Sequence, residues 1–364
     1  MILSEIIRVL EQFAHPSLQE SYDNSGLQTG SPSMDVNGAL ITVDITDEVL
    51  DEAIDTGYNL IISHHPLIFG GIKTLTGKNA TERLVIKAVR NEVAIYSGHT
   101  NFDAVYNGVN SRICDKLGLI NTRILDPVYG KLKKLVVFVP LSYSGEVREA
   151  LFRGGAGMIG NYDYCSFNAE GTGTFRGGES TNPFVGEKGK FHKEPEVRIE
   201  TIIPEYLAHD AIEAMKLVHP YEEVAWDIYP LDNEFPLVGM GMTGELPEGM
   251  EEMMFLQFLK DRFAAGCIRH SAFTGRKVRK VAVCGGAGSS LLKKAVRQNA
   301  DVFITGDMKY HQFFDADGKI LIADIGHYES EQFTRELFYD LIIKKFPKFA
   351  VRLSEINTNP IKYF

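Results

Sequence analysis

Short apolar strands alternate with helices at both ends of the chain, and this alternation restricts the folds that it can adopt. Residues 38–44 have the pattern of a buried strand, residues 46–54 that of a helix, and residues 58–62 that of a second strand. The alternation returns from residue 277 to the end, where apolar spacing predicts a long helix over residues 326–345. Strands that alternate with helices indicate a sheet with helices packed on its faces, so we predict an α/β protein.

The middle of the chain follows a different pattern, which repeats. A strand ending in proline and then a helix occur over residues 133–152, and a strand ending in proline, a helix and a further strand occur over residues 197–229. Two such units form a ferredoxin-like α+β domain. The glycine-rich segment 171–193 between them is expected to be an exposed hairpin or a mobile loop. The predicted domains are an α/β domain made of residues 1–128 and 233–364, and an inserted domain of residues 129–232.

Side chains that bind metals follow four of the predicted strands. The residues concerned are His64, His65, His99, Asp103, Asp307, His311, His327 and Glu331. A single histidine at a strand end is more often an ordinary hydrogen-bonding residue, and a His/Glu pair on a helix is more often a surface pair. Ligands bind at the carboxyl ends of strands in open α/β sheets, however, and these residues recur there in both halves of the chain. The recurrence predicts a metal site.

The spacing of these residues favours two metal ions over one. His64 and His65 are adjacent, so they reach one cleft but hardly the same coordination position. His327 and Glu331 are four residues apart on a predicted helix and therefore share a face, whereas Glu329 is expected to point into solvent. A carboxylate can bridge two cations, and Glu331 or Asp103 could do so. A nitrogen and oxygen donor set without cysteine suits zinc, iron, manganese or nickel.

Charge and cysteine usage narrow the class of protein. The 364 residues carry a net charge of −10, which argues against a broad basic surface for nucleic acid. The four cysteines are widely spaced, which indicates reduced thiols. Charged residues interrupt the apolar N-terminus, so it is not a signal peptide, and no stretch is long enough to span a membrane. We expect a cytoplasmic protein.

Two loops are ambiguous. Residues 284–290 are rich in glycine and join a strand to a helix, so they form either a weak triphosphate-binding loop or a tight turn. Residues 23–26 form either an Asx turn lining the cleft or an ordinary loop.

The chain resembles the dinuclear metal-centre proteins known as GTP cyclohydrolase 1 type 2 homologues, or Nif-three-like proteins. The matching segments are residues 22–27, 63–66, 99–103, 305–307 and 327–331, and the middle is similar to the PII/CutA-like inserted domain of the longer bacterial members. The resemblance implies that His65 and Asp103 bind one metal, that His64 and His327 bind the other, and that Glu331 bridges them. It also implies a toroidal homohexamer whose metal sites face an internal cavity and whose inserted domains cap the openings.

These features lead to one expected activity and two alternatives. Two such metals would activate a water for hydrolysis, and the resemblance implies GTP as the substrate, with opening of the guanine imidazole ring and release of formate. His99 and His311 are then candidates for orienting ligands or transferring protons, although His99 could instead cap a turn and His311 lie on a helix surface. One alternative is a phosphoesterase acting on nucleotides. The other is a non-enzymatic metal-holding scaffold or regulator that binds a protein partner or a small effector.

Overall fold

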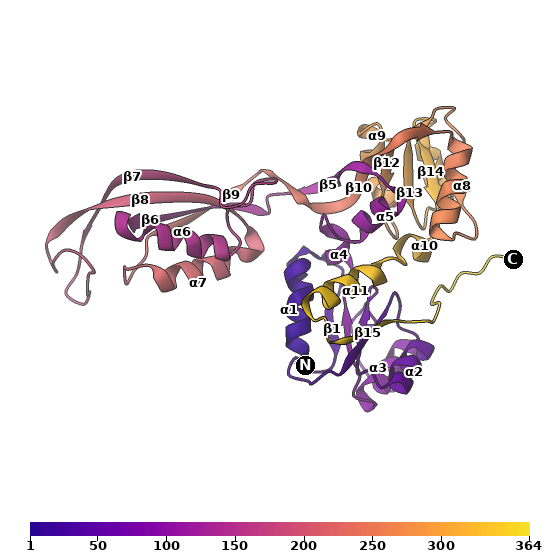
Figure 1. Ribbon diagram of the computed structural model, residues 1–364, viewed down its shortest axis with the longest axis horizontal. Helices are drawn as coiled ribbons and strands as arrows, with labels where there is room; N and C mark the ends of the chain where they lie inside the picture. Colours follow the sequence, from indigo (N-terminus) through magenta and orange to yellow (C-terminus); the bar gives the residue numbers. More distant parts are fainter. The chain divides into compact units, whose positions relative to one another are not determined.

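The computed structural model describes residues 1–364. Its contacts divide the chain into two units, one made of Met1–Pro127 and Leu237–Phe364 and the other of Val128–Pro236 (Figure 1). We call them the α/β unit and the inserted unit. In the α/β unit two sheets carry helices on their faces, as the alternation of strands and helices predicted.

The first sheet of the α/β unit is five-stranded, in the order β1-β4-β3-β2-β15. Its strands are β1 (Gly26–Thr29), β4 (Ala94–Ser97), β3 (Leu60–Ser63), β2 (Gly38–Thr42) and β15 (Ala350–Leu353). β15, β2, β3 and β4 are parallel, and β1 is antiparallel to β4. Parallel strands that are covered on both faces are apolar throughout, and all residues of β2, β3 and β4 are buried.

Helices cover both faces of this sheet (Figure 1). On one face lie α1 (Leu3–Phe13) and α11 (Thr334–Lys345), and on the other lie α2 (Asp47–Thr56) and α3 (Ala80–Arg90). The side chain of Thr46 caps α2 by accepting a hydrogen bond from Val49 N, and Gly57 ends the helix in the left-handed conformation with φ 74°. The expected helix start is therefore confirmed.

The second sheet of this unit is six-stranded, in the order β11-β14-β13-β12-β10-β5. Its strands are β11 (Arg269–His270), β14 (Leu321–Asp324), β13 (Val302–Thr305), β12 (Val278–Val283), β10 (Glu234–Met250) and β5 (Ile120–Tyr129). β12, β13 and β14 are parallel, so their carboxyl ends lie at one edge. α5 (Val109–Leu117) and α8 (Glu252–Phe263) pack on one face, and η4 (Ser289–Leu291), α9 (Leu292–Arg297) and η5 (Tyr310–Ala316) pack on the other.

The predicted helix over residues 326–345 is interrupted, so that prediction is wrong in its length. α10 (His327–Glu331) ends at Glu331, and α11 begins at Thr334. Phe333, between them, packs into the core of the six-stranded sheet, where its ring lies 5.6 Å from that of Phe263. Phe338 of α11 packs into the core of the five-stranded sheet instead. The helices break because they serve two different cores.

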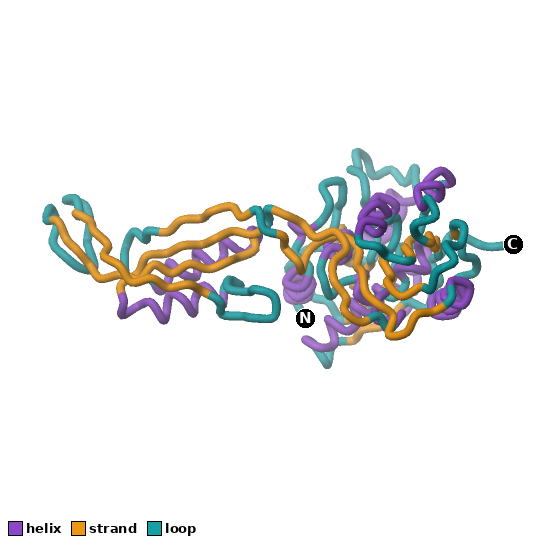
Figure 2. The backbone as a smooth tube through the Cα atoms, turned by 90° about the horizontal axis from the view of Figure 1, so that it is seen from above, coloured by secondary structure: helices purple, strands orange, loops and turns teal.

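The inserted unit is a ferredoxin-like domain, as its sequence repeat predicted. Its elements are β6 (Leu132–Pro140), η2 (Leu141–Tyr143), α6 (Ser144–Arg153), β7 (Ser166–Arg176), β8 (Phe191–Pro204), η3 (Glu205–Leu207), α7 (Ala208–Val218) and β9 (Trp226–Leu231). The four strands form an antiparallel sheet in the order β7-β8-β6-β9, which is the split βαβ arrangement. β7 and β8 form a long hairpin (Figure 2). Residues 171–176 and 191–193 belong to its strands, as the hairpin alternative predicted, and residues 177–190 form the loop between them. The narrower likeness to PII and CutA stays a prediction.

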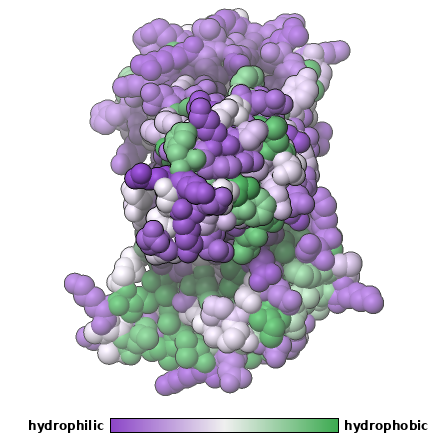
Figure 3. Space-filling model, turned by 90° about the vertical axis from the view of Figure 1, so that its left-hand side faces the viewer, coloured by the Kyte–Doolittle hydropathy of each residue, from purple (hydrophilic) through white to green (hydrophobic).

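Hydrophilic side chains make up most of the surface shown in Figure 3, and hydrophobic side chains form smaller groups between them. No helix of the chain combines the length and the apolar character that crossing a membrane requires.

Replacing Phe338 with alanine should destabilise the α/β unit. The Phe338 ring is fully buried and packs edge-on against Phe102, with the ring centroids 4.8 Å apart. Loss of this ring should lower the free energy of unfolding by about 3–5 kcal/mol, as measured by urea denaturation. The control Val89→Ala removes a side chain that is 60% exposed, and it should change the free energy by less than about 0.5 kcal/mol. Equal effects of the two substitutions would contradict this account of the core.

Candidate metal centre

The predicted ligands lie at the carboxyl ends of strands from both sheets. His64 and His65 directly follow β3, Asp103 lies on α4 (Thr100–Ala104) after β4, and His327 and Glu331 are the first and last residues of α10 after β14. The structure brings these five residues together, with His99, in three overlapping groups whose ligand atoms lie within 4.8 Å of one another. Each group could hold a metal ion.

His64 presents an unpaired nitrogen to two carboxylates. Its Nδ1 lies 2.9 Å from the carbonyl oxygen of Gly98, which only accepts, so Nδ1 carries the proton. Complete burial lowers the pKa of His64, so the ring is neutral and Nε2 has a free lone pair. That nitrogen lies 3.7 Å from Asp103 Oδ1 and 3.5 Å from Glu331 Oε1. His64 Nε2 and Asp103 Oδ1 are buried and have no hydrogen-bond partner. Facing acceptors of this kind fit a cation between them.

Glu331 divides its two oxygens between two sets of side chains. Oε1 faces His64, whereas Oε2 lies 3.0 Å from His65 Nε2 and 3.1 Å from His327 Nε2. The resulting groups are His64 with Asp103 and Glu331, and His65 with His327 and Glu331. This grouping differs from the pairing that the family resemblance implied, in which His65 went with Asp103. The reason is geometric, because the buried His64 ring faces the Asp103 side chain directly.

Three of the histidine rings have a carboxylate within hydrogen-bond distance of Nδ1. Asp44 Oδ1 lies 2.7 Å from His65 Nδ1, Asp307 Oδ2 lies 2.7 Å from His327 Nδ1, and Asp23 Oδ1 lies 2.7 Å from His99 Nδ1. A partner on one ring nitrogen orients the ring and leaves the other nitrogen for a metal. The sequence pattern does not predict these partner roles, and Asp307, a candidate ligand by its position, instead contacts His327. Asp44 follows the end of β2, the same signal that identified the ligands, and Asp23 lies in the loop that remained ambiguous.

In the polypeptide alone, protons compensate the buried carboxylates. Burial works against protonation of His65, but Asp44 and Glu331 outweigh it and raise the pKa of His65 to about 10. His327 behaves in the same way: burial is outweighed by Glu331 and Asp307, and its pKa rises to about 9. Burial and the neighbouring Glu331 raise the pKa of Asp103 well above its usual range. A cation bound here would take the place of these protons.

The glycine-rich loop over residues 284–290 makes room for Glu331. A Cβ atom at Gly286 would lie 2.3 Å from Glu331 Oε1, and Gly286 has a φ of +60° that favours glycine. Its N–H donates to Ser330 Oγ, and the N–H groups of Gly285 and Gly288 donate to side chains as well. These three groups are therefore not free to bind a phosphate, and the loop is the tight turn that was the alternative.

A pocket of about 410 Å³ opens onto the cluster. Its lining includes His65, His99, Asp103, His327 and Glu331, together with Tyr22, Phe69, Met240 and Cys284. The rings of Tyr22 and Phe69 are largely exposed, and their centroids lie 6.3 Å apart. The pocket has room for a small molecule beside the ligands.

Two sequence expectations about this site need correction. Glu329 is buried instead of solvated, because Asn359 Nδ2 donates to its Oε1 at 3.0 Å and its Oε2 folds back over Gly326. His311 is not brought to the cluster, since it is exposed on η5 and its ring contacts those of Tyr310 and Phe314. His99, in contrast, lies in the cluster beside His64 and His65.

The fold and the cluster together define an α/β protein with a buried histidine and carboxylate centre that could hold metal. The sequence matches the Duf34/NIF3 (NGG1p interacting factor 3) family over residues 1–360. Proteins named GTP cyclohydrolase 1 type 2 homolog from Halalkalibacterium halodurans and Bacillus subtilis are 39% and 38% identical, over 98% and 99% of this chain and 98% of each relative. The crystal structure of a Bacillus cereus protein related to NIF3 is 40% identical, with a TM-score of 0.87 over 100% of this chain and 99% of that one. The chain belongs to the Duf34/NIF3 family.

Gly286→Ala should empty the cluster of metal without unfolding the protein. The added Cβ would displace the Glu331 carboxylate, so bound metal measured by plasma mass spectrometry should fall by most of its value. Gly118→Ala is a matched control, because Gly118 also has a positive φ, of 65°, but no atom within 4 Å of an added Cβ. In both variants, an alanine in the left-handed conformation lowers the free energy of unfolding by about 1–2 kcal/mol. Similar metal loss in both would contradict the role given to Gly286.

Asp307→Asn should weaken metal binding through His327. The amide keeps the size of the side chain but does not stabilise the required His327 tautomer, so affinity should fall by about 10–100-fold in a chelator competition titration. Asp317→Asn is the control, since Asp317 shares the positive φ (48° against 55°) and pairs with Lys319 instead. Unchanged affinity in Asp307→Asn would show that Asp307 does not position the ring.

Proposed function

We propose that this protein is a dinuclear metal-dependent hydrolase that acts on a small, nucleotide-like substrate. The observation that carries the proposal is the division of the Glu331 oxygens between the group containing His64 and Asp103 and the group containing His65 and His327. A bridging carboxylate between two sets of ligands is the arrangement that a two-metal hydrolytic site requires. The five proposed metal ligands are His64, His65, Asp103, His327 and Glu331.

The donor set favours divalent zinc, iron, manganese or nickel, because it consists of imidazole nitrogens and carboxylate oxygens. When bound, two such ions supply Lewis acidity and lower the pKa of a water, which makes it a nucleophile near neutral pH. His99 lines the same pocket and its Nδ1 contacts Asp23, which supports the proposal that its Nε2 moves a proton to or from the substrate. Tyr22 and Phe69 offer ring faces on which a planar base can stack.

In its most concrete form, the proposal is that GTP is the substrate. One water would add to C8 of the guanine base and break one C–N bond, which opens the imidazole ring to a formamide. A second water would hydrolyse that formamide, so that formate leaves and an amine remains on the pyrimidine ring. The names of the relatives from Halalkalibacterium halodurans and Bacillus subtilis support this choice, and the small pocket and its exposed aromatic rings are compatible with a purine. The homohexameric ring implied by the family resemblance is part of the same proposal.

The purified protein should contain close to two transition-metal ions per chain and should release formate from GTP. Glu331→Gln should lose most of the metal and the turnover, because the amide provides one oxygen and no charge, while light scattering should still give the mass of a hexamer. The matched control is Glu329→Gln, since Glu329 lies on the same helix and is similarly buried but faces Asn359.

The remaining outcomes separate the alternatives. Cleavage of phosphodiesters without formate release would favour a phosphoesterase. A metal-free protein that stays folded and binds a protein partner would favour the non-enzymatic scaffold. Full turnover in Glu331→Gln would exclude Glu331 as the bridging ligand.

A further inference from the structure

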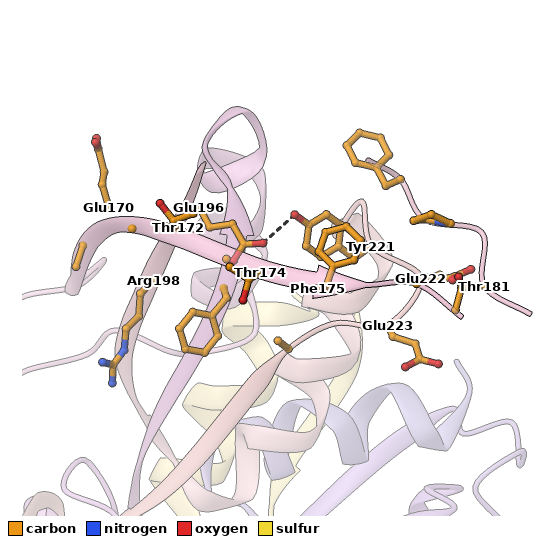
Figure 4. A pocket seen from close by; sticks show the side chains of 18 residues that line it. Glu170, Thr172, Thr174, Phe175, Thr181, Glu196, Arg198, Tyr221, Glu222 and Glu223 are labelled. Carbon is orange, nitrogen blue, oxygen red and sulfur yellow. Dashed lines mark hydrogen bonds between the residues drawn. The ribbon is translucent and has the colours of Figure 1, made fainter. Parts of the chain in front are cut away.

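A second pocket lies in the inserted unit, and nothing in the proposed hydrolase accounts for it. Its volume is about 650 Å³, which is within the range of small-molecule sites. It is lined by residues of β7, β8, the loop between them, the end of β6 and the loop that joins α7 to β9 (Figure 4). All of these belong to the inserted unit, so the pocket is complete within that unit.

The strand pattern of β7 explains why the pocket exists. Ala169, Gly171, Gly173 and Phe175 alternate along the strand and therefore share one face of the sheet. Three small residues in this row leave a hollow, and the fourth bounds it with an aromatic ring. Glu196 pairs with Gly171 across the strands, so it lies on the same face. The buried core beneath α6 and α7 is formed by the alternate residues of β8, which places the pocket on the opposite face.

Glu196 places a buried carboxylate at the floor of the pocket. Its side chain is 9% exposed. Its Oε2 lies 2.2 Å from the position that a Cβ atom at Gly173 would occupy, so only glycine leaves room for the carboxylate there. The hydroxyl of Tyr221 donates to Oε1 at 2.8 Å (Figure 4). Burial and the Glu196 carboxylate raise the pKa of Tyr221, so the phenol keeps its proton and remains a donor. A neutral hydroxyl satisfies a lone pair of the carboxylate but does not neutralise its charge.

The remaining lining is acidic and aromatic. Glu222 and Glu223 add two carboxylates, and Arg198 is the one basic residue of the lining. The Glu170 side chain alternates with the row that faces the pocket, so it points to the other face of the sheet. The Arg198 guanidinium pairs with Glu200 at 2.9 Å, and Figure 4 shows it directed away from Tyr221. The Tyr221 ring lies 6.4 Å from the ring of Phe175 and 6.4 Å from that of Phe184. Three rings around one carboxylate form the arrangement that binds an ammonium group through cation–π attraction.

We propose that this pocket binds a small organic cation, with the ammonium group on Glu196 and the attached alkyl groups among Phe175, Phe184 and Tyr221. The buried Glu196 carboxylate and the acidic residues at the rim disfavour phosphorylated and other anionic ligands. The inference does not depend on the metal cluster, which lies in the other unit.

Titration calorimetry on the full-length protein tests the charge requirement. The probe pair is choline and its neutral carbon isostere 3,3-dimethylbutan-1-ol, which have the same shape. Choline should bind with a dissociation constant of about 1 mM or lower, and the isostere should bind about tenfold more weakly. Equal binding of the two compounds, or no heat from choline at about ten times that concentration, would overturn the proposal.

Choline binding by variants of the pocket residues tests whether the cation binds in this pocket. Glu196→Gln should weaken choline binding at least about tenfold, and Phe175→Leu should weaken it about threefold, since it removes the π face but keeps the apolar contact. Glu213→Gln is the control, because Glu213 is an exposed residue of α7 that pairs with Lys216 outside the pocket. All three variants should keep the metal content and the thermal midpoint of the parent.

Two outcomes of the substitution series contradict the assignment. If Glu196→Gln binds choline as the parent does, the carboxylate does not recognise the cation. If Glu196→Gln instead changes the assembly mass measured by light scattering and leaves choline binding unaffected, the face packs against a second copy of the chain. In either case the proposed ligand site is wrong.

Discussion

The burial of the Glu331 carboxylate is the constraint on which the candidate metal centre depends. This side chain is 3% exposed, and a carboxylate without compensation in such surroundings costs several kcal/mol. The neighbouring residues offset that free-energy cost. Gly286 leaves room for one oxygen, α10 places His327 one turn away, and β3 ends at the position that brings His64 and His65 to both oxygens.

Positive charge for this cluster can come from protons or from cations. The raised pKa values of His65 and His327 show that the polypeptide holds protons there tightly. His64 does not hold a proton in the same way, because complete burial lowers its pKa. Its free nitrogen and Asp103 Oδ1 are left without partners. Protonation of the other histidines therefore compensates only part of the site, whereas a cation beside His64 would satisfy both remaining atoms.

The sequence predicted which side chains come together, because strand ends in an α/β sheet converge and the residues after β3, β4 and β14 are of metal-binding types. The same argument also applies to Asp44, which follows β2 and contacts His65 but is not among the predicted residues. Other features depend on contacts that local patterns do not contain. Gly286 is required by a carboxylate 45 residues later in the chain, as the numbering of Glu331 shows. Glu329 is buried through Asn359, in a terminal segment without regular structure.

Two buried carboxylates, one in each unit, are compensated in different ways, and the difference indicates what each can bind. Glu331 is surrounded by imidazoles, which are metal ligands when neutral, so inorganic cations suit it. Glu196 has a phenol and aromatic ring faces around it, and these offer no lone pairs suited to a divalent metal. Ring faces attract large, weakly hydrated cations, whose dehydration costs little, more than small, strongly hydrated metal ions. The donors around each carboxylate, more than its charge, therefore separate an inorganic site from an organic one.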